Sequence, residues 1–509
     1  MQDFTGIWLA PGKICPTDHS PIRRKGRPVH SHTVLLTFRP HSSPKKFLII
    51  ALLDVKAYLV IRRVPHNQAT FNSSFGSSGV TQNAADAAWK TYDYVVVGGG
   101  LTGLTVAARL AENPSTKVLV IEAGGDNRAD PRVYDIYKYG QAFNSDLDWQ
   151  FPTERGNIAG GKTLGGSSSI NGAAWTRASK AQYDAWGSFL KPEESYLNWT
   201  WNSMFSYMNK AETFSPPNSE QRAKGADAVN DYHGYSGPVQ ITFPSKMYGG
   251  PQQGAFVKSI QSAVGIKKCA DISGGDANCV AYTPNVRESS LNGHCNLYAH
   301  QSINWRESDH RSSAASAYLT PVESLRKNWL TLVNHQVTKL LWTTDNSKFA
   351  YGVEFRQTDV PCTPFQVYVT KEVILAAGAI NTPAVLQRSG VGDPALMNPL
   401  GIPTVLNIPT VGKNLQEQTM SVLGSSSNGF DPKGDGPSDV IAFPNFYELF
   451  GREAAPRASE IRSSLDRWAT EQASNALSAK ALKDIYGIQA TLILDNKGTF
   501  TQHSVMALY

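Results

Sequence analysis

The sequence predicts an α/β protein built on a parallel sheet, with irregular, helical and antiparallel segments added to it. Two observations carry this prediction. Between residues 94 and 122, a buried strand, a glycine turn, a helix and a second buried strand follow one another, and such a unit places its strands parallel in one sheet. Residues 372–379 form another apolar run that ends in small residues, which is typical of a strand whose carboxyl end approaches a ligand.

The turn in the first unit has the spacing of a dinucleotide-binding fingerprint, Gly98-Gly99-Gly100-Leu101-Thr102-Gly103. Gly98 lets the chain turn sharply, Gly100 leaves the backbone open to a pyrophosphate, and Gly103 lets the helix pack closely on the strand. The helix N-terminus directs free N–H groups and a partial positive charge at the phosphates. Glu122 is expected to accept hydrogen bonds from an adenosine ribose, and its charge disfavours NADP. A glycine turn that binds nothing is the alternative interpretation.

A second glycine-rich block covers residues 160–172, Gly-Gly-Lys-Thr-Leu-Gly-Gly-Ser-Ser-Ser-Ile-Asn-Gly. It is too rich in Gly and Ser for regular structure, and backbone amides and small hydroxyls of this kind can wrap a planar ligand. A flexible surface loop is the alternative, but the text that follows, Ala173 to Arg177, is unlike a linker.

Hydrophobic periodicity predicts the remaining elements. Helices are expected at 178–190 and 254–265, a strand at 238–242, and an antiparallel element from short strands at 330–333, 337–342, 350–355 and 366–370. After the buried strand 372–379, the text Asn381-Thr382-Pro383 is expected to open a helix, since Pro is favoured near the first helical position.

The charge distribution argues against nucleic-acid binding. The chain has 509 residues and a net charge of +6, but residues 1–63 hold 11 Lys and Arg against 3 Asp and Glu, so the folded body is slightly acidic. Residues 1–89 are predicted to be a disordered tail and linker. The apolar run 47–53 faintly resembles an internal signal peptide and is too short to span a bilayer.

Cysteine spacing predicts no metal site. The five cysteines are Cys15, Cys269, Cys279, Cys295 and Cys362, and none of the spacings fits paired zinc ligands. One disulfide among Cys269, Cys279 and Cys295 is expected if the protein is exported. Glycosylation acceptor triplets at Asn72 and Asn198 point weakly the same way.

Taken in order, these motifs resemble the glucose–methanol–choline (GMC) oxidoreductase family of FAD enzymes over residues 90–500. The matching text is Gly98–Gly103, Glu122–Gly124, Gly165–Gly172, Ala376–Pro383 with Ser389–Gly392, and Val411–Gln416. Within the family, the chain is most similar to the fungal glucose oxidases, through Trp175-Thr-Arg177 followed by Lys180-Ala-Gln182, and through Asn414-Leu-Gln-Glu-Gln418.

The resemblance implies a Rossmann-like FAD-binding domain with a parallel sheet and an interleaved, incomplete α+β substrate domain. The implied division is a tail and linker at 1–89, the first part of the FAD-binding domain at 90–190, an irregular and helical segment with substrate-side elements at 191–310, the second part of the FAD-binding domain at 311–415, and the start of a truncated substrate-binding domain at 416–509.

The resemblance also assigns roles to single residues. Leu101 and Thr102 would lie at the pyrophosphate, Glu122 at the adenosine ribose, and the backbone of Val337 at the adenine. Gly166, Ser167, Asn171 and Gly172 belong to the block that lines the ribityl chain and isoalloxazine. Ala174 stands where the glucose oxidases have a threonine, so one hydroxyl contact to FAD is expected to be lost. Tyr139 and Trp175 match positions near the substrate entrance, with packed aromatics as the alternative.

The implied reaction is the oxidation of a sugar or primary alcohol, with hydride transfer to the flavin and reoxidation by oxygen or another acceptor. The family's base is a histidine paired with a second histidine or an asparagine nearer the C-terminus, and none of the 11 histidines matches it, so the catalytic residues are unknown. In the family, the later part of the chain also returns to the nucleotide-binding domain and adds structure against FAD. Weak FAD binding and doubtful activity are therefore expected of this sequence.

A catalytically silent flavin-binding role is the alternative function. An NAD-linked dehydrogenase would leave the second glycine block unexplained. Secretion and a homodimer are expected by family likeness alone.

Overall fold

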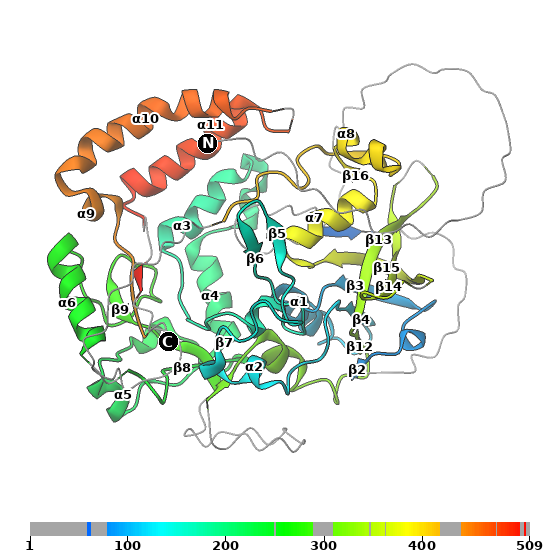
Figure 1. Ribbon diagram of the computed structural model, residues 1–509, viewed down its shortest axis with the longest axis horizontal. Helices are drawn as coiled ribbons and strands as arrows, with labels where there is room; N and C mark the ends of the chain where they lie inside the picture. Colours follow the sequence, from blue (N-terminus) through cyan, green and yellow to red (C-terminus); the bar gives the residue numbers. More distant parts are fainter. Residues whose placement is uncertain are drawn as a thin grey trace.

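A computed structural model of the chain describes residues 59–62, 79–248, 251–288, 309–345, 348–361, 363–417, 439–474, 476–498 and 503–504. The apolar run 47–53, Asn72, Cys15, Cys295 and Cys362 lie outside these ranges. Within them, an eight-stranded sheet with its helices occupies one side of the molecule, and a second region of helices and small sheets occupies the other (Figure 1).

The main sheet is mixed, and its parallel part is the α/β core that the sequence predicts. The strand order is β13-β14-β15-β3-β4-β12-β2, with β1 paired to β15. The bounds are β1 (Leu59–Arg62), β2 (Gly79–Thr81), β3 (Thr91–Val97), β4 (Val118–Ile121), β12 (Trp329–Leu332), β13 (His335–Trp342), β14 (Ala350–Gln357) and β15 (Phe365–Leu375). Strands from β15 to β2 run parallel, whereas β13, β14 and β15 pair antiparallel.

Helices cover this sheet and join it to its glycine turns. α1 (Leu101–Leu110) follows β3, and α7 (Gly378–Arg388) follows β15 and packs on β13. On α1, residues Leu104, Ala107 and Ala108 are buried with Val96 and Val120 of the sheet in one apolar cluster. This burial fixes the direction of α1 and so aims its N-terminus at the carboxyl ends of the strands.

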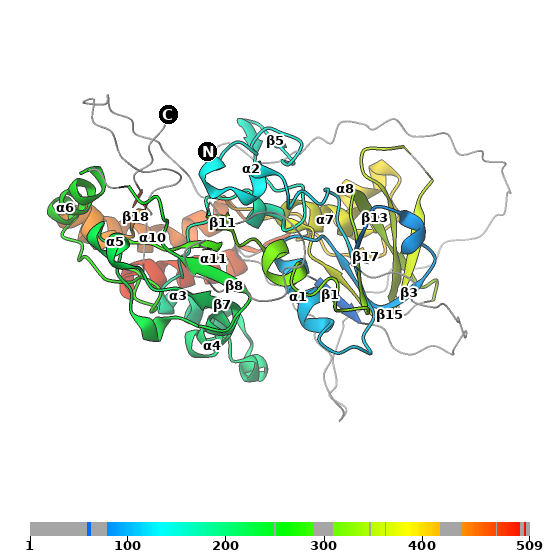
Figure 2. The same ribbon diagram turned by 90° about the horizontal axis from the view of Figure 1, so that it is seen from below.

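The second region contains α3 (Lys180–Ala185), α4 (Trp201–Ala211), α5 (Ser219–Ala223), α6 (Gln252–Val264), α9 (Phe446–Phe450), α10 (Ala454–Glu471) and α11 (Ala479–Ala490). Its small sheets are β11-β10-β8-β7 and β19-β18-β9. Their bounds are β7 (Glu212–Phe214), β8 (Val239–Thr242), β9 (Val280–Tyr282), β10 (Asn285–Glu288), β11 (His310–Arg311), β18 (Val440–Ala442) and β19 (His503–Ser504). Seen from below, this region again lies beside the main sheet (Figure 2).

Several local predictions are wrong. Residues 330–333 were expected in an antiparallel element, but β12 pairs parallel with β4 and β2; all four of its residues are buried, and strands buried on both faces read as apolar runs in parallel sheets. Residues 366–370 and 372–375 form one strand, β15, with a register irregularity between Val369 and Glu372, whereas residues 378 and 379 already belong to α7.

Helix and tail boundaries also differ. α7 begins at Gly378, so Pro383 lies inside the helix and does not open it. The predicted helix 178–190 is α3 followed by a 3₁₀ segment, Trp186–Phe189. Residues 59–62 and 79–81, predicted as tail and linker, are strands of the main sheet, because their backbones pair with β15 and β12.

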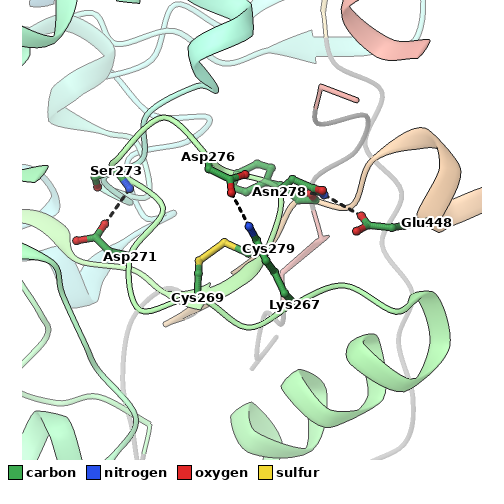
Figure 3. The surroundings of a disulfide bond; sticks show 9 residues. Lys267, Cys269, Asp271, Ser273, Asp276, Asn278, Cys279 and Glu448 are labelled. Carbon is green, nitrogen blue, oxygen red and sulfur yellow. Dashed lines mark hydrogen bonds and ion pairs between the residues drawn. A yellow bond between two sulfur atoms is a disulfide. The ribbon is translucent and has the colours of Figure 1, made fainter. Parts of the chain in front are cut away.

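A disulfide closes a short loop in the second region. Cys269 and Cys279 are bonded, with Cα atoms 5.9 Å apart, and Asp271, Ser273 and Asp276 lie in the loop between them (Figure 3). Asn278 reaches from this loop to Glu448 of α9 at 2.8 Å. This pair satisfies the prediction of one disulfide among three of the cysteines.

Removing this disulfide is expected to destabilise the protein moderately. The bond joins residues 10 apart in sequence, and loop-closure entropy for that length is worth about 3 kcal/mol of unfolding free energy. The double variant Cys269→Ala/Cys279→Ala should therefore show a lower urea midpoint than the wild type. Adding a reductant should lower the midpoint of the wild type and leave that of the variant unchanged; an equal response of both would contradict the pairing.

None of the helices in the described part of the chain is long and apolar enough to cross a membrane.

Candidate functional site

The glycine turn after β3 forms a tightly packed cradle at the carboxyl end of the sheet. Gly98 has φ +102°, and a Cβ there would lie 2.5 Å from the carbonyl oxygen of Ala376. A Cβ on Gly103 would lie 1.9 Å from the carbonyl oxygen of Gly98. Gly100 is the N-cap of α1 and has no side-chain cap. Glycine is therefore required at 98 and 103, and the first amides of α1 remain available to an anion.

The second glycine block lies directly against the first. Gly165 donates its N–H to the carbonyl oxygen of Gly99 at 2.8 Å, and Gly100 and Gly165 form a parallel bridge. Gly166 has φ +55°, and a Cβ there would come within 2.9 Å of the Cα of Gly100. The backbones of the two blocks are thus in direct contact, with no side chains between them. The surface that they form consists of amide and carbonyl groups.

A cavity of about 260 Å³ opens over this surface. Of the residues predicted from sequence, Gly98, Gly100, Glu122, Gly166, Ser167 and Val337 line it. Its other walls include Trp149, Phe151, His335, Ala376–Asn381, Arg388 and Leu415–Glu417. The cavity therefore brings together the βαβ turn, the second glycine block, β13 and the start of α7.

The other predicted residues are not among those that line the cavity. Gly103 is buried beneath the turn, whereas Leu101 is exposed at the start of α1. Asn171 and Ala174 are also exposed, and Thr102 and Gly172 are half-buried. The ring of Tyr139 lies against Gly172, 3.5 Å from where a Cβ would be. Trp175 is half-buried and packs against the core cluster of α1.

Glu122 is buried and bonded at both carboxylate oxygens. Oε2 accepts the N–H of Gly99 at 2.7 Å and Oε1 accepts that of Gly124 at 2.8 Å. Burial raises the pKa of Glu122 to about 7, although the backbone hydrogen bonds to Gly124 and Gly99 lower it. A carboxylate has about four acceptor positions, so not all of them are taken by the backbone and a ligand hydroxyl can donate to it.

This raised pKa makes the stability of the cofactor-free protein fall with pH. The carboxyl ionises in the unfolded chain near its usual 4.5 and in the folded protein near 7. Stability is therefore unaffected by Glu122 below pH 4.5, falls between 4.5 and 7, and carries the full penalty, about 3 kcal/mol, above 7. The urea midpoint of the variant Glu122→Gln, measured from pH 4.5 to 8, should lack this fall. If the midpoint of the variant falls with pH as steeply as that of the wild type, Glu122 is not the cause.

The turn that carries Asn171 is strained and is held by a buried arginine that sequence reasoning missed. Ala173 is buried with φ +58°, a conformation that costs a non-Gly residue about 1 kcal/mol or more. Arg311 of β11 donates to the carbonyl oxygen of Val133 at 2.9 Å, and to the carbonyl oxygen and Oδ1 of Asn171 at 2.7 and 2.8 Å. Burial lowers the pKa of Arg311 to about 10. Its partners lie 140 or more residues away in sequence, and no local signal marks it.

A second missed group fixes Trp175. Its indole N–H donates to Glu212 Oε2 at 2.8 Å, and Glu212 Oε1 pairs with Arg177 at 2.9 Å and with His233 at 3.0 Å. The other ring nitrogen of His233 lies 2.8 Å from Asp271. We call Arg177, Glu212, His233 and Asp271 the buried ionic network, since each side chain is at most 3% exposed.

The protonation of this network follows from its geometry. Burial lowers the pKa of His233, but the hydrogen bonds to Asp271 and Glu212 outweigh it, and the net shift is upward. A protonated ring donates to both carboxylates, and the two positive charges then balance the two negative ones. His233 is therefore a structural histidine and not a free base.

The residues present fit an adenine dinucleotide. Two glycine segments meet without side chains, a helix N-terminus is uncapped beside them, and a buried carboxylate lines the same cavity. These features supply backbone donors for a pyrophosphate and an acceptor for a ribose. Within the described ranges, no group of three or more His, Cys, Asp or Glu side chains is placed to hold a metal ion.

Known proteins share both the sequence and the fold. The chain is 34% identical over 424 residues to the glucose oxidase of Penicillium chrysogenum, covering 81% of this chain and 65% of that protein. Identity to glucose oxidase 2 of Penicillium expansum is 35% over 439 residues, covering 83% and 66%. The chain thus spans about two thirds of the length of these curated relatives.

Among solved structures, an FAD-dependent oxidoreductase from Chaetomium thermophilum matches with a TM-score of 0.67 and 25% identity, covering 81% of this chain and 72% of that one. A fungal aryl-alcohol oxidase shares the fold at a TM-score of 0.65 and 24% identity, covering 82% and 72%. The family model described as GMC oxidoreductase matches residues 92–420, which confirms the resemblance read from the motifs. The chain belongs to the GMC oxidoreductase family.

Proposed function

We propose that this chain binds FAD and takes part in the oxidation of a CH–OH group of a sugar or alcohol, with oxygen or another acceptor reoxidising the flavin. The observation that carries the proposal is the meeting of the two glycine blocks beside Glu122 at the N-terminus of α1. Family membership and the relatives named glucose oxidase support it.

In this proposal the chain's own residues bind and orient the cofactor. Gly98, Gly100 and the first amides of α1, including those of Leu101 and Thr102, would hold the pyrophosphate. Glu122 would accept the ribose hydroxyls, and the backbone of Val337 would meet the adenine. Bound FAD supplies the two-electron acceptor for hydride from the alcohol carbon.

The flavin end is assigned to the turn that Arg311 holds. Ser167, Asn171, Gly172 and Ala174 would lie along the ribityl chain and ring, so Arg311 would act as a positioning residue through Asn171. Tyr139 and Trp175 would border the substrate. We assign the base that removes the alcohol proton to no residue of this chain.

Two measurements test the proposal in order. Purified protein is titrated with FAD and the flavin absorbance and fluorescence are followed; the proposal expects saturable binding. The loaded protein is then mixed without oxygen with glucose or an aryl alcohol, and bleaching of the flavin absorbance reports single-turnover reduction. Bound but unreduced flavin would favour a flavin-binding role without alcohol oxidation, and absence of binding would refute both functions.

We also propose that the protein is exported, which the disulfide between Cys269 and Cys279 supports because such bonds persist in oxidising compartments. The acceptor residue Asn198 is exposed, and the hydroxyl of Thr200 donates to its Oδ1 at 3.3 Å. A homodimer remains a proposal from family likeness, which light scattering of the purified protein would test.

A further inference from the structure

We propose that Arg388 determines cofactor specificity in this cavity by stacking its guanidinium group on the adenine ring of FAD. This inference rests on the proposed function and deepens it, because it names a residue that would distinguish adenine-containing flavins from those without adenine. Nothing in the glycine fingerprint or in the motifs around it points to this side chain.

The position of Arg388 is set by the residue that follows it. The Oγ of Ser389 accepts the N–H of Leu340 at 2.8 Å, and the carbonyl oxygen of Ser389 accepts the indole N–H of Trp342 at 2.7 Å. Both partners lie on β13, so the C-terminal end of α7 is fixed to the strand that carries Val337. Arg388 and Val337 accordingly line the same cavity.

The charge of Arg388 has no counterion in the described part of the chain. Its side chain is half-buried, and no carboxylate there lies within ion-pair distance of it. The charged group that affects the pKa of Arg388 is a second arginine, Arg356 of β14. Arg356 lies opposite Gln336 of β13 in the sheet. Burial lowers the pKa of Arg388, and Arg356 lowers it further. A half-buried cation that faces a like charge is costly unless a ligand compensates for it.

The surroundings decide which ligand compensates. A guanidinium group is planar and weakly hydrated, and it stacks on aromatic faces as well as pairing with phosphates. A 2′-phosphate is opposed by Glu122, which lines the same cavity and carries a negative charge when ionised. A flat purine ring is complementary to this part of the cavity, because it can stack on the guanidinium group of Arg388 and contact the apolar side chains of Val337 and Val385.

The test compares ligands that share only part of FAD. Calorimetric titration of the wild type, Arg388→Met and Arg388→Lys with FAD, 5′-ADP and FMN separates the adenine from the flavin contribution. Arg388→Met should bind FAD and 5′-ADP about tenfold more weakly and FMN unchanged. Arg388→Lys should be intermediate, because it keeps the charge and loses the planar group. The matched control Arg356→Met, which removes an exposed neighbour, should not weaken FAD binding.

Each other outcome is informative. An equal loss of FAD and FMN affinity in Arg388→Met would show a general structural effect and overturn the inference, as would unchanged FAD affinity. Tighter binding of 2′,5′-ADP than of 5′-ADP by the wild type would show a phosphate site instead. If the wild type binds 5′-ADP through Arg388 but not FAD, the proposed function fails and the adenine contact stands. If the wild type binds none of the ligands, both fail.

Discussion

We expect the variant Gly103→Val to lose FAD binding and most of its stability, because residue 103 lies beneath the glycine turn after β3. A Cβ on residue 103 would lie 1.9 Å from the carbonyl oxygen of Gly98 and 3.3 Å from Cγ1 of Val96. Because the nearest atom belongs to the backbone, no side-chain rotation relieves the clash, and α1 must move away from β3. We expect the free energy of unfolding to fall by more than about 4 kcal/mol and FAD affinity to fall at least about 100-fold.

A glycine inside another helix provides the matched control. Gly254 lies in α6, and a Cβ added there meets nothing within 4 Å. Gly254→Ala should raise the free energy of unfolding by about 0.5–1 kcal/mol, since alanine is the better helix former. Urea unfolding and FAD titration of both variants check the pair. Wild-type FAD affinity in Gly103→Val would mean that the cradle is not where the cofactor binds.

Breaking the buried ionic network is expected to have the second large effect. Arg177 pairs with Glu212 and also donates to the carbonyl oxygens of Tyr232 and Ser273. In Arg177→Met, Glu212 stays buried with only the His233 ring to balance two carboxylates. Leaving such a charge without its partner costs about 3–5 kcal/mol. The urea midpoint should fall accordingly.

An exposed pair shows whether burial is the cause. Arg222 and Asp227 form an ion pair whose side chains are 48% and 53% exposed. Arg222→Met should change the free energy of unfolding by less than about 1 kcal/mol. Equal losses in Arg177→Met and Arg222→Met would show that the buried ionic network is no more important than a surface contact. Because Glu212 also holds the indole of Trp175, near-ultraviolet circular dichroism should change in Arg177→Met alone.

Local chemistry made part of this site predictable from sequence. A six-residue motif with fixed glycine spacing predicts the glycines at 98 and 103. The acid at 122 is recognisable because it follows a strand that is apolar throughout. Partners far apart in sequence were not predictable. The residues that flank Arg311 in the sequence are polar and give no sign of its role. That role depends on Asn171, which lies 140 residues earlier in the sequence. His233 gave no signal either, since Glu212 and Asp271 meet it only in the folded protein.

Strand direction was likewise hidden. β12 precedes the antiparallel strand β13 in the sequence, yet it pairs parallel with β4 and β2, which lie far away in the sequence. Its side chains are buried in two apolar clusters, Trp329 in one and Leu330 and Leu332 in the other. The start of α7 was placed too late because Pro383 is a common opening residue, whereas the helix already begins at Gly378, which has φ +86°.

The place of β15 beside β3 has a consequence for synthesis on the ribosome. The hydroxyl of Thr370 donates to the carbonyl oxygen of Tyr92 across a separation of 278 residues. At about 5–20 residues per second, the nascent chain therefore exposes one edge of β3 for roughly 15 to 55 seconds before its neighbour is translated. Unpaired edges of this kind recruit other strands, so chaperone supply and translation rate should govern the yield of soluble protein.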